Sequence, residues 1–267
     1  MRASSSAITG PQYIRDRPHS ARRKAGTGGP SVLRAGGWGL PASPPGFPTL
    51  AGGAAGGAGP ELKSNDSAVP GPGPELIGPP VGSFYAWWRG DPLVPLPPLP
   101  GLTIEVASDP AALVGPEGPG PAEVEARFAA GHRAYLARLD GEPAAYGWVA
   151  TIQAEVGELG LSFKLPPANR YLWDFYTRPP WRGLGIYPRL LQAILGREAD
   201  AERFWVGHDT PNIPSRRGIL KAGFQEVGRV YRTAGGGLVL VGVGSIERAT
   251  AAARLLGIRL LTDPAGA

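Results

Sequence analysis

The spacing of apolar residues changes at one point in the middle of the chain and predicts a strand followed by a helix. Tyr171–Thr177 is rich in aromatic residues and ends in a β-branched one, a composition typical of a buried strand. The apolar positions that follow recur at offsets of 0, 4, 5, 8 and 9, which fits a helical period and not an alternating strand. They are Ile186, Leu190, Leu191, Ile194 and Leu195. We expect a central strand at 171–177 and a helix at 186–197, joined by a turn.

The pattern before this segment predicts an antiparallel part of a sheet. Leu102–Val106 alternates, and Ala134–Leu139 and Ala144–Ile152 flank an Asp-Gly turn signal. Pro121–Gly131 is typical of a helix, since proline suits a first turn and glycine a C-terminal cap. We expect Gly157–Phe163 to extend the sheet.

The pattern after the central helix predicts a parallel strand and a closing hairpin. Arg203–Val206 follows the helix as a short strand, and this order indicates a parallel pair with a right-handed crossover. Asn212–Ala222 is the next expected helix, with Asn212 as its N-cap. The hairpin comprises Gln225–Arg232 and Leu238–Val243, and Ile246–Leu260 is a terminal amphipathic helix. The fold class is therefore α/β, with a mixed sheet and not a doubly wound parallel one.

Composition divides the 267 residues unevenly. Most of the Gly- and Pro-rich runs lie in residues 1–80, which offer few branched apolar residues to bury, so we expect a disordered low-complexity tail there. Residues 81–100 combine an aromatic cluster with a proline run, which suggests an extended arm on the domain surface. One folded domain is expected at 101–245, followed by a C-terminal helix and tail at 246–267.

Charge and cysteine content narrow the possible functions only a little. The net charge is +5, and part of the excess lies between residues 15 and 24, which favours a solvated basic segment over a nucleic-acid surface. The absence of cysteine excludes disulfides, thiolate zinc sites and a cysteine nucleophile. No apolar run approaches the roughly 18 residues of a membrane span, and no signal-peptide core is present. We expect a cytoplasmic protein without a membrane partner.

The turn between the central strand and helix carries the main chemical signal. It reads Arg182-Gly183-Leu184-Gly185-Ile186-Tyr187. A strand that enters a glycine turn and then a helix directs free N–H groups and the positive end of the helix dipole at one point, where a phosphate or pyrophosphate fits. The alternative is a glycine turn that only packs the helix on the sheet. Pro188 replaces the third glycine of a dinucleotide-binding motif, and the G-x-x-x-x-G-K-[ST] phosphate loop is missing, which argues against both of those classes.

A set of residues in fixed order resembles a known family. The set comprises Pro179, Trp181, Arg182, Gly185, Asn212, Ser215 and the Ala222-Gly223-Phe224 end of the next helix. Arg182 and Gly185 match the motif Arg/Gln-x-x-Gly-x-Gly/Ala that opens a helix after a strand. Over about residues 100–245 the ordered set resembles the GNAT superfamily of N-acetyltransferases.

This resemblance implies a co-substrate and a reaction. Acetyl-CoA, or another acyl-CoA, would lie between the central strand and Arg203–Val206, with its pyrophosphate on the N–H groups of the turn, and no metal is implied. The residues expected to contact it are Phe175, Tyr176, Thr177, Arg178, Arg182, Gly183, Leu184, Gly185, Ile186, Tyr187, Asn212, Ser215 and Arg217. A primary amine of a small-molecule or peptide acceptor would attack the thioester directly, while the main chain near 175–178 polarises the acyl carbonyl.

Two positions depart from the family pattern. Tyr187 stands where a small residue is usual, and it is tolerable if its side chain points away from the anion site. Ile219 stands where many members carry a tyrosine that protonates the departing thiolate, so solvent or another hydroxyl would have to serve. Both departures favour the alternative of a non-catalytic, acyl-CoA-binding regulatory domain.

The reaction also requires a base for the amine proton. Asp174 is the first candidate, because a carboxylate in an apolar strand beside the turn is expected to have a raised pKa; the alternative is a structural ion pair with an arginine. Glu158 and His208 are weaker candidates.

Overall fold

The computed structural model describes residues 74–114 and 118–262. The predicted disordered tail therefore lies outside the described residues up to position 73. Its last residues, predicted to be part of that tail, instead belong to the first strand, which begins at Leu76. All described residues fall within one unit spanning 33–267.

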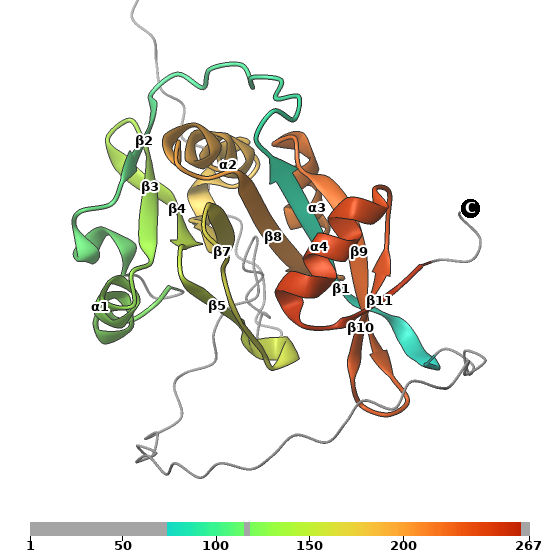
Figure 1. Cartoon of the computed structure of the whole chain (residues 1–267). Helices are drawn as coiled ribbons and strands as arrows, with labels where there is room; N and C mark the ends of the chain where they lie inside the picture. Colours follow the sequence, from blue (N-terminus) through green and yellow to red (C-terminus); the bar gives the residue numbers. More distant parts are fainter. Residues whose placement is uncertain (1–73, 115–117, 263–267) are drawn as a thin grey trace, which may run out of the picture. The chain divides into compact units, whose positions relative to one another are not determined.

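The strands form one large mixed sheet and one small sheet (Figure 1). The order in the large sheet is β11-β10-β9-β1-β8-β7-β4-β3-β2. In that order the strands are β11 (Arg259–Leu261), β10 (Leu238–Gly242), β9 (Gln225–Thr233), β1 (Leu76–Trp88), β8 (Arg203–Asp209), β7 (Asn169–Thr177), β4 (Glu142–Ala150), β3 (Arg133–Leu139) and β2 (Leu102–Val106). β7 runs parallel to β8 and β10 parallel to β11, and the other neighbours are antiparallel. The predicted mixed α/β sheet is confirmed.

Within residues 74–114 and 118–262, four α-helices cover the two faces of the large sheet. They are α1 (Pro121–Ala129), α2 (Ile186–Arg197), α3 (Ile213–Lys221) and α4 (Ile246–Leu256). The buried residues of α2 and α3 pack in one apolar cluster, whereas those of α1 and α4 pack in a second cluster on the other face. Short 3₁₀ turns lie at Pro110–Leu113, Gly157–Leu159 and Pro179–Trp181. The predicted strand, turn and helix at the centre of the chain are thus present as β7 and α2.

The structure corrects the aromatic half of the surface arm predicted at 81–100, whereas residues 92–99 have no regular secondary structure and are mostly exposed. Residues 82–88 pair with β8 on one side, and β1 also pairs with β9 on the other, so the aromatic segment lies inside the sheet. Phe84 and Ala86 belong to one apolar cluster, and Tyr85 and Trp87 to the other. Because both faces of residues 84–87 are covered, this end of β1 is continuously apolar and lacks the alternation that identifies a half-exposed strand.

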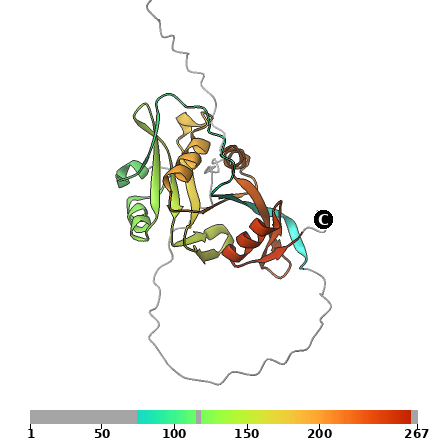
Figure 2. The ribbon, with the colours of Figure 1, turned by 45° about the horizontal axis from the view of Figure 1, so that its top comes forward.

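Two further predictions differ from the structure. Residues 157–163 do not extend the large sheet: β5 (Gln153–Val156) and β6 (Leu161–Lys164) form a separate pair, joined by a 3₁₀ turn that ends at Gly160 in the left-handed region. The small sheet packs beside α4 (Figure 2). The terminal helix ends at Leu256 and not Leu260, because Gly257 adopts the left-handed conformation of a C-terminal cap and β11 follows.

Candidate functional site

The candidate site begins where β7 and β8 stop pairing. Their parallel register runs from Asn169 opposite Arg203 to Leu172 opposite Val206, and beyond this point neither strand pairs with the other. β7 is also irregular here, because its register with β4 shifts and Asp174 has a φ of 45°. This bulge interrupts the alternation, so the ring of Phe175 lies over Gly147, where a Cβ would come within 2.1 Å of it. The bulge therefore requires glycine at 147.

Asp174 is fully buried and forms an ion pair. Its Oδ2 accepts a hydrogen bond from Nη1 of Arg127 at 2.5 Å, while Nη2 of Arg127 donates to Glu123 at 2.6 Å. The Arg127 guanidinium also lies over the rings of Trp148 and Trp173, at 4.9 and 4.4 Å from their centroids. The structure thus contains the arginine ion pair that was the alternative to a free base. We therefore interpret Asp174 as a structural residue that holds the bulge in β7 through its ion pair with Arg127, and not as the base.

The turn before α2 presents backbone donors, as predicted. Gly183 and Gly185 have φ values of 85° and 71°, which side chains other than glycine rarely adopt. Within the described part of the chain, no backbone acceptor outside regular helices and strands binds the N–H groups of residues 183–187. The first N–H groups of a helix also have no acceptor inside it. Pro188 carries no N–H, so the run of donors ends at Tyr187. We call residues 183–187 the amide turn.

Two arginines hold the amide turn in shape. Nη1 of Arg189 donates to the carbonyl of Gly185 at 2.7 Å, and its Nε and Nη2 donate to the carbonyl of Pro97 at 3.0 and 2.7 Å. Arg182 donates from Nε to the carbonyl of Thr177 at 2.9 Å, which ties the turn to the end of β7. Both side chains bind carbonyl oxygens, so the turn keeps its conformation while its amides remain available.

The side chain of Tyr187 points into the protein and away from the amide turn. Its ring packs against Phe175 at a centroid distance of 5.1 Å, and only 8% of the residue is exposed. A Cβ on Gly218 of α3 would lie 2.3 Å from this ring, so α2 and α3 approach each other through a tyrosine and a glycine. The large residue at 187 is therefore compatible with an anion at the backbone of the turn.

Four polar side chains gather under the amide turn, between the sheet, α2 and α3. They are Tyr85, Tyr187, His208 and Ser215, which we call the hydroxyl cluster. The Tyr85 hydroxyl lies 2.9 Å from Nε2 of His208. Burial raises the pKa of Tyr187, and the nearby Ser215 side chain partly offsets this rise. Both the Tyr187 hydroxyl and Oγ of Ser215 are buried, and neither forms a hydrogen bond of good geometry with a described residue.

His208 is held as a neutral acceptor. Nδ1 lies 2.7 Å from the carbonyl oxygen of Asp209, which can only accept, so Nδ1 carries the proton and Nε2 accepts from Tyr85. Burial lowers the pKa of His208, and the bond to Asp209 opposes this. Burial, and secondly the Glu226 carboxylate, raise the pKa of Tyr85. At neutral pH the pair is therefore a protonated tyrosine and an uncharged imidazole.

The remaining predicted residues are divided between structural and exposed positions. Asn212 is buried and caps α3 by accepting from the N–H of Ser215 at 3.1 Å. The N–H of Arg178 donates to the carbonyl of Ala144 at 2.9 Å, so this amide does not point at an acyl group. Arg217 is exposed, and Glu158 is exposed in the turn between β5 and β6. Neither Arg217 nor Glu158 belongs to the hydroxyl cluster.

Tyr85 is the member of the site that the sequence did not reveal. It lies in β1, whose aromatic run predicted a surface arm and whose pairing with β8 spans residues far apart in the chain. The available signal was the continuous apolar run around it, which is typical of a strand buried on both faces.

Neither a metal centre nor a membrane-crossing helix is present in residues 74–114 and 118–262. No group of three or more His, Cys, Asp or Glu side chains there could hold a metal ion. The helices in this part of the chain are also too short, or not apolar enough, to traverse a bilayer.

Comparison with known proteins found a match to one family model over part of the chain. Residues 105–224 match the family model described as "Acetyltransferase (GNAT) family". This range contains β7, the amide turn, α2, β8 and α3, but not β1 or α4. A search of curated proteins found no match.

A search of solved structures found matches to part of the chain. A GCN5-related N-acetyltransferase from Kribbella flavida is 18% identical over 57% of this chain and 55% of its own, with a TM-score of 0.35. A putative GNAT acetyltransferase from Novosphingobium aromaticivorans is 20% identical over 57% and 66%, with a TM-score of 0.37. A GCN5-related N-acetyltransferase from Sphaerobacter thermophilus is 16% identical over 57% and 51%, with a TM-score of 0.41. The chain thus spans about half to two thirds of these proteins.

Proposed function

Residues 105–224 belong to the acetyltransferase (GNAT) family, and from this premise we propose that the protein is an acyltransferase that moves an acetyl group from acetyl-CoA to a primary amine. The acceptor is a small molecule or a peptide that carries the amine. The single observation that supports this proposal most is the amide turn: donors at the start of α2, beside two strands that have stopped pairing.

The residues of the turn fit a diphosphate. Gly183 has open space where a Cβ would stand, so a phosphate oxygen can approach the backbone there. The positive end of the α2 dipole adds to the attraction, and Arg217 is an exposed cation on the neighbouring helix. Acetyl-CoA supplies an activated acyl group when bound.

Groups of the protein would then stabilise the charge on the acyl oxygen and transfer protons to and from the reactants. Arg178 donates its N–H toward β4, so by the alternation of a strand the N–H of Thr177 faces the β8 side, where it can bind the acyl oxygen. Tyr187 carries its proton at neutral pH, as tyrosines ordinarily do, and burial raises its pKa further; its hydroxyl can deliver that proton to the leaving thiolate. It would supply the hydroxyl that Ile219, fully buried in α3, lacks. Nε2 of His208 can take up a proton through Tyr85.

Calorimetric titration of the full chain with acetyl-CoA tests the amide turn. Gly183→Ala adds one methyl group at a φ of 85° that faces open space, so the bound phosphate is the group it would displace. We expect its affinity for acetyl-CoA to fall about tenfold or more, since close approach to the backbone is lost. Gly236→Ala is the matched control, because Gly236 has a φ of 79° and equally open surroundings in the β9–β10 hairpin. Equal affinity in wild type and Gly183→Ala would overturn the assignment.

A thiol-release assay separates catalysis from binding. A panel of primary amines is offered with acetyl-CoA, and free CoA is measured. Release that depends on one amine class supports the transferase. If the protein binds acetyl-CoA tightly but releases no CoA in the presence of any amine, the result would instead support a non-catalytic regulatory domain. Tyr187 and Ile219 suggested that alternative.

A further inference from the structure

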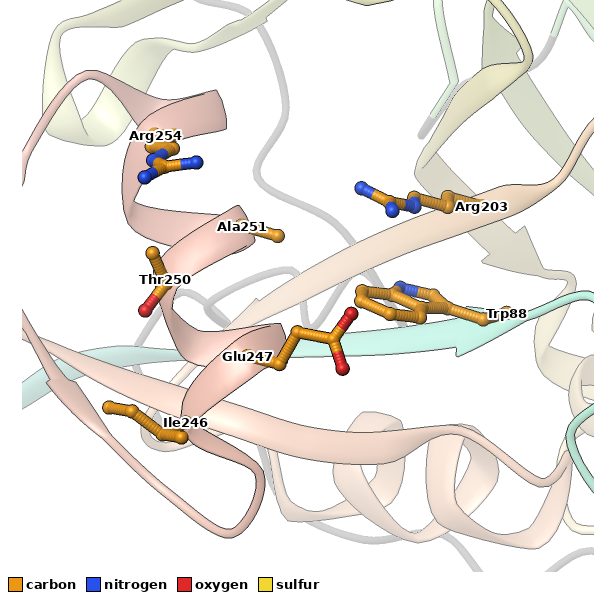
Figure 3. Close-up of a pocket in the computed structure, with 7 residues that line it drawn as sticks. All are labelled: Trp88, Arg203, Ile246, Glu247, Thr250, Ala251 and Arg254. Carbon is orange, nitrogen blue, oxygen red and sulfur yellow. The ribbon is translucent and has the colours of Figure 1, made fainter.

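A pocket lies on the other face of the sheet from the amide turn, near the opposite end of the central strands. Its volume is about 270 Å³, and it is lined by Trp88 at the end of β1, Arg203 at the start of β8 and one face of α4 (Figure 3). β7 and β8 are parallel, so both strands point their carboxyl ends toward the amide turn. Arg203 is the first residue of β8 and therefore lies at the opposite end of these strands. The pocket is therefore separate from the proposed acyl-transfer site.

The indole of Trp88 contacts two arginines that differ in their ion pairing. The guanidinium carbons of Arg203 and Arg248 lie 4.3 and 4.5 Å from its ring centroid. Arg248 binds both carboxylate oxygens of Asp91, at 2.7 and 2.6 Å. Arg203 forms no ion pair or side-chain hydrogen bond within the described residues. One arginine thus anchors the ring, and the other keeps its donors for a ligand.

The facing surface of α4 carries charges of both signs. Glu247, Thr250, Ala251 and Arg254 follow one another at helical spacing and all line the pocket. Figure 3 shows the guanidinium groups of Arg203 and Arg254 pointing toward one another across the pocket, with the Glu247 carboxylate also directed into it. Neither Arg254 nor Glu247 has an ion pair with another described residue. Scattered surface charges are usually solvated, but Arg203, Glu247 and Arg254 all line the same pocket.

We infer that this pocket binds a small zwitterion of the α-amino acid class. Arg203 and Arg254 bind the carboxylate, for which guanidinium donors are suited, and Glu247 binds the ammonium group. Trp88, Ile246 and Ala251 provide apolar surface for a side chain. The volume lies just below the roughly 300–1,000 Å³ of sites for drug-sized ligands, which suits a free amino acid. A simple carboxylate would leave Glu247 unpaired, and a simple amine would leave both arginines unpaired.

The first test is a thermal shift of the full chain, without acyl-CoA, in the presence of each common L-amino acid. We expect at least one to raise the melting temperature, because a ligand that binds only the folded state stabilises it. The best binder is then compared by calorimetry with its des-amino acid and its decarboxylated amine. Each analogue should bind at least tenfold more weakly. No shift from any amino acid, or equal binding of either analogue, overturns the proposal.

Variants assign the binding to this pocket. Arg203→Gln should abolish binding of the amino acid, and Glu247→Gln should remove the preference for the amino acid over its des-amino analogue. Glu125→Gln, an exposed glutamate on α1, is the matched control and should change neither. Gly183→Ala should leave the amino-acid affinity unchanged, so failure of the acyl-transfer site is distinguishable from failure of this one. Wild-type binding by Arg203→Gln would refute the assignment.

Discussion

The Arg127 ion pairs and the hydroxyl cluster lie on opposite faces of the large sheet, and they differ in how many of their polar atoms form hydrogen bonds. On the face of α1 and α4, the Arg127 guanidinium binds two carboxylates and contacts two indole rings. On the face of α2 and α3, the hydroxyl cluster keeps two hydroxyls without a partner among the described residues. A buried charge pair stabilises the fold only while both partners remain, whereas an unpaired buried hydroxyl retains hydrogen-bonding capacity for a ligand. The Arg127 ion pairs therefore stabilise the fold, whereas the hydroxyl cluster can still bind a ligand.

The largest expected effect is on stability, at the ion pair. Arg127→Met leaves the Asp174 carboxylate buried and without its cation, so we expect the free energy of unfolding to fall by about 3–5 kcal/mol. Urea unfolding at pH 7 measures this. Arg138→Met is the control, because the Arg138–Glu105 pair is much more exposed and should contribute about 1 kcal/mol or less. Similar losses in both variants would show that the burial of the pair does not matter.

The next effect is on turnover, at the hydroxyl cluster. Tyr187→Phe keeps the packing against Phe175 and Gly218 but removes the proton donor, so turnover should fall about 100-fold with the KM for acetyl-CoA nearly unchanged. Steady-state CoA release measures both parameters. Tyr171→Phe removes a buried, unpartnered hydroxyl from the other face and should leave turnover unchanged. If the two variants behave alike, Tyr187 is not the proton donor.

The smallest effect concerns pH, because the face of α1 and α4 holds the half-buried His132 and the face of α2 and α3 holds the buried His208. Burial, and secondly the Arg127 charge, lower the pKa of His132 from 6.5 to about 4. The unfolded chain therefore binds this proton near pH 6.5 while the folded chain resists it. The stability contributed by neutral His132 is complete above about pH 6.5, falls as the pH drops toward 4, and is lost below that.

His132→Gln should flatten the decline of stability between pH 6.5 and 4, as measured by urea unfolding at a series of pH values. His208→Gln provides the comparison on the other face, where burial also lowers the pKa. It should act in the same direction, and it should also lower turnover, because glutamine can accept a hydrogen bond from Tyr85 but cannot take up a proton. An unchanged slope in His132→Gln would contradict the assigned cause.

The sequence predicted the part of the fold and site that depends on local contacts. The strand and helix around the amide turn and the N-cap of α3 follow from neighbouring residues, and the structure confirms them. The acceptor and the roles of the site residues stay predictions.

Only the tertiary structure could decide which distant groups meet. β1 enters the sheet between β8 and β9, which brings Tyr85 to His208 across 123 positions, and no local pattern encodes that pairing. Asp174 had two sequence interpretations because its partner Arg127 lies 47 positions away on α1. Periodicity reports which face of an element is buried, but a polar group's role depends on the charge that packing places beside it.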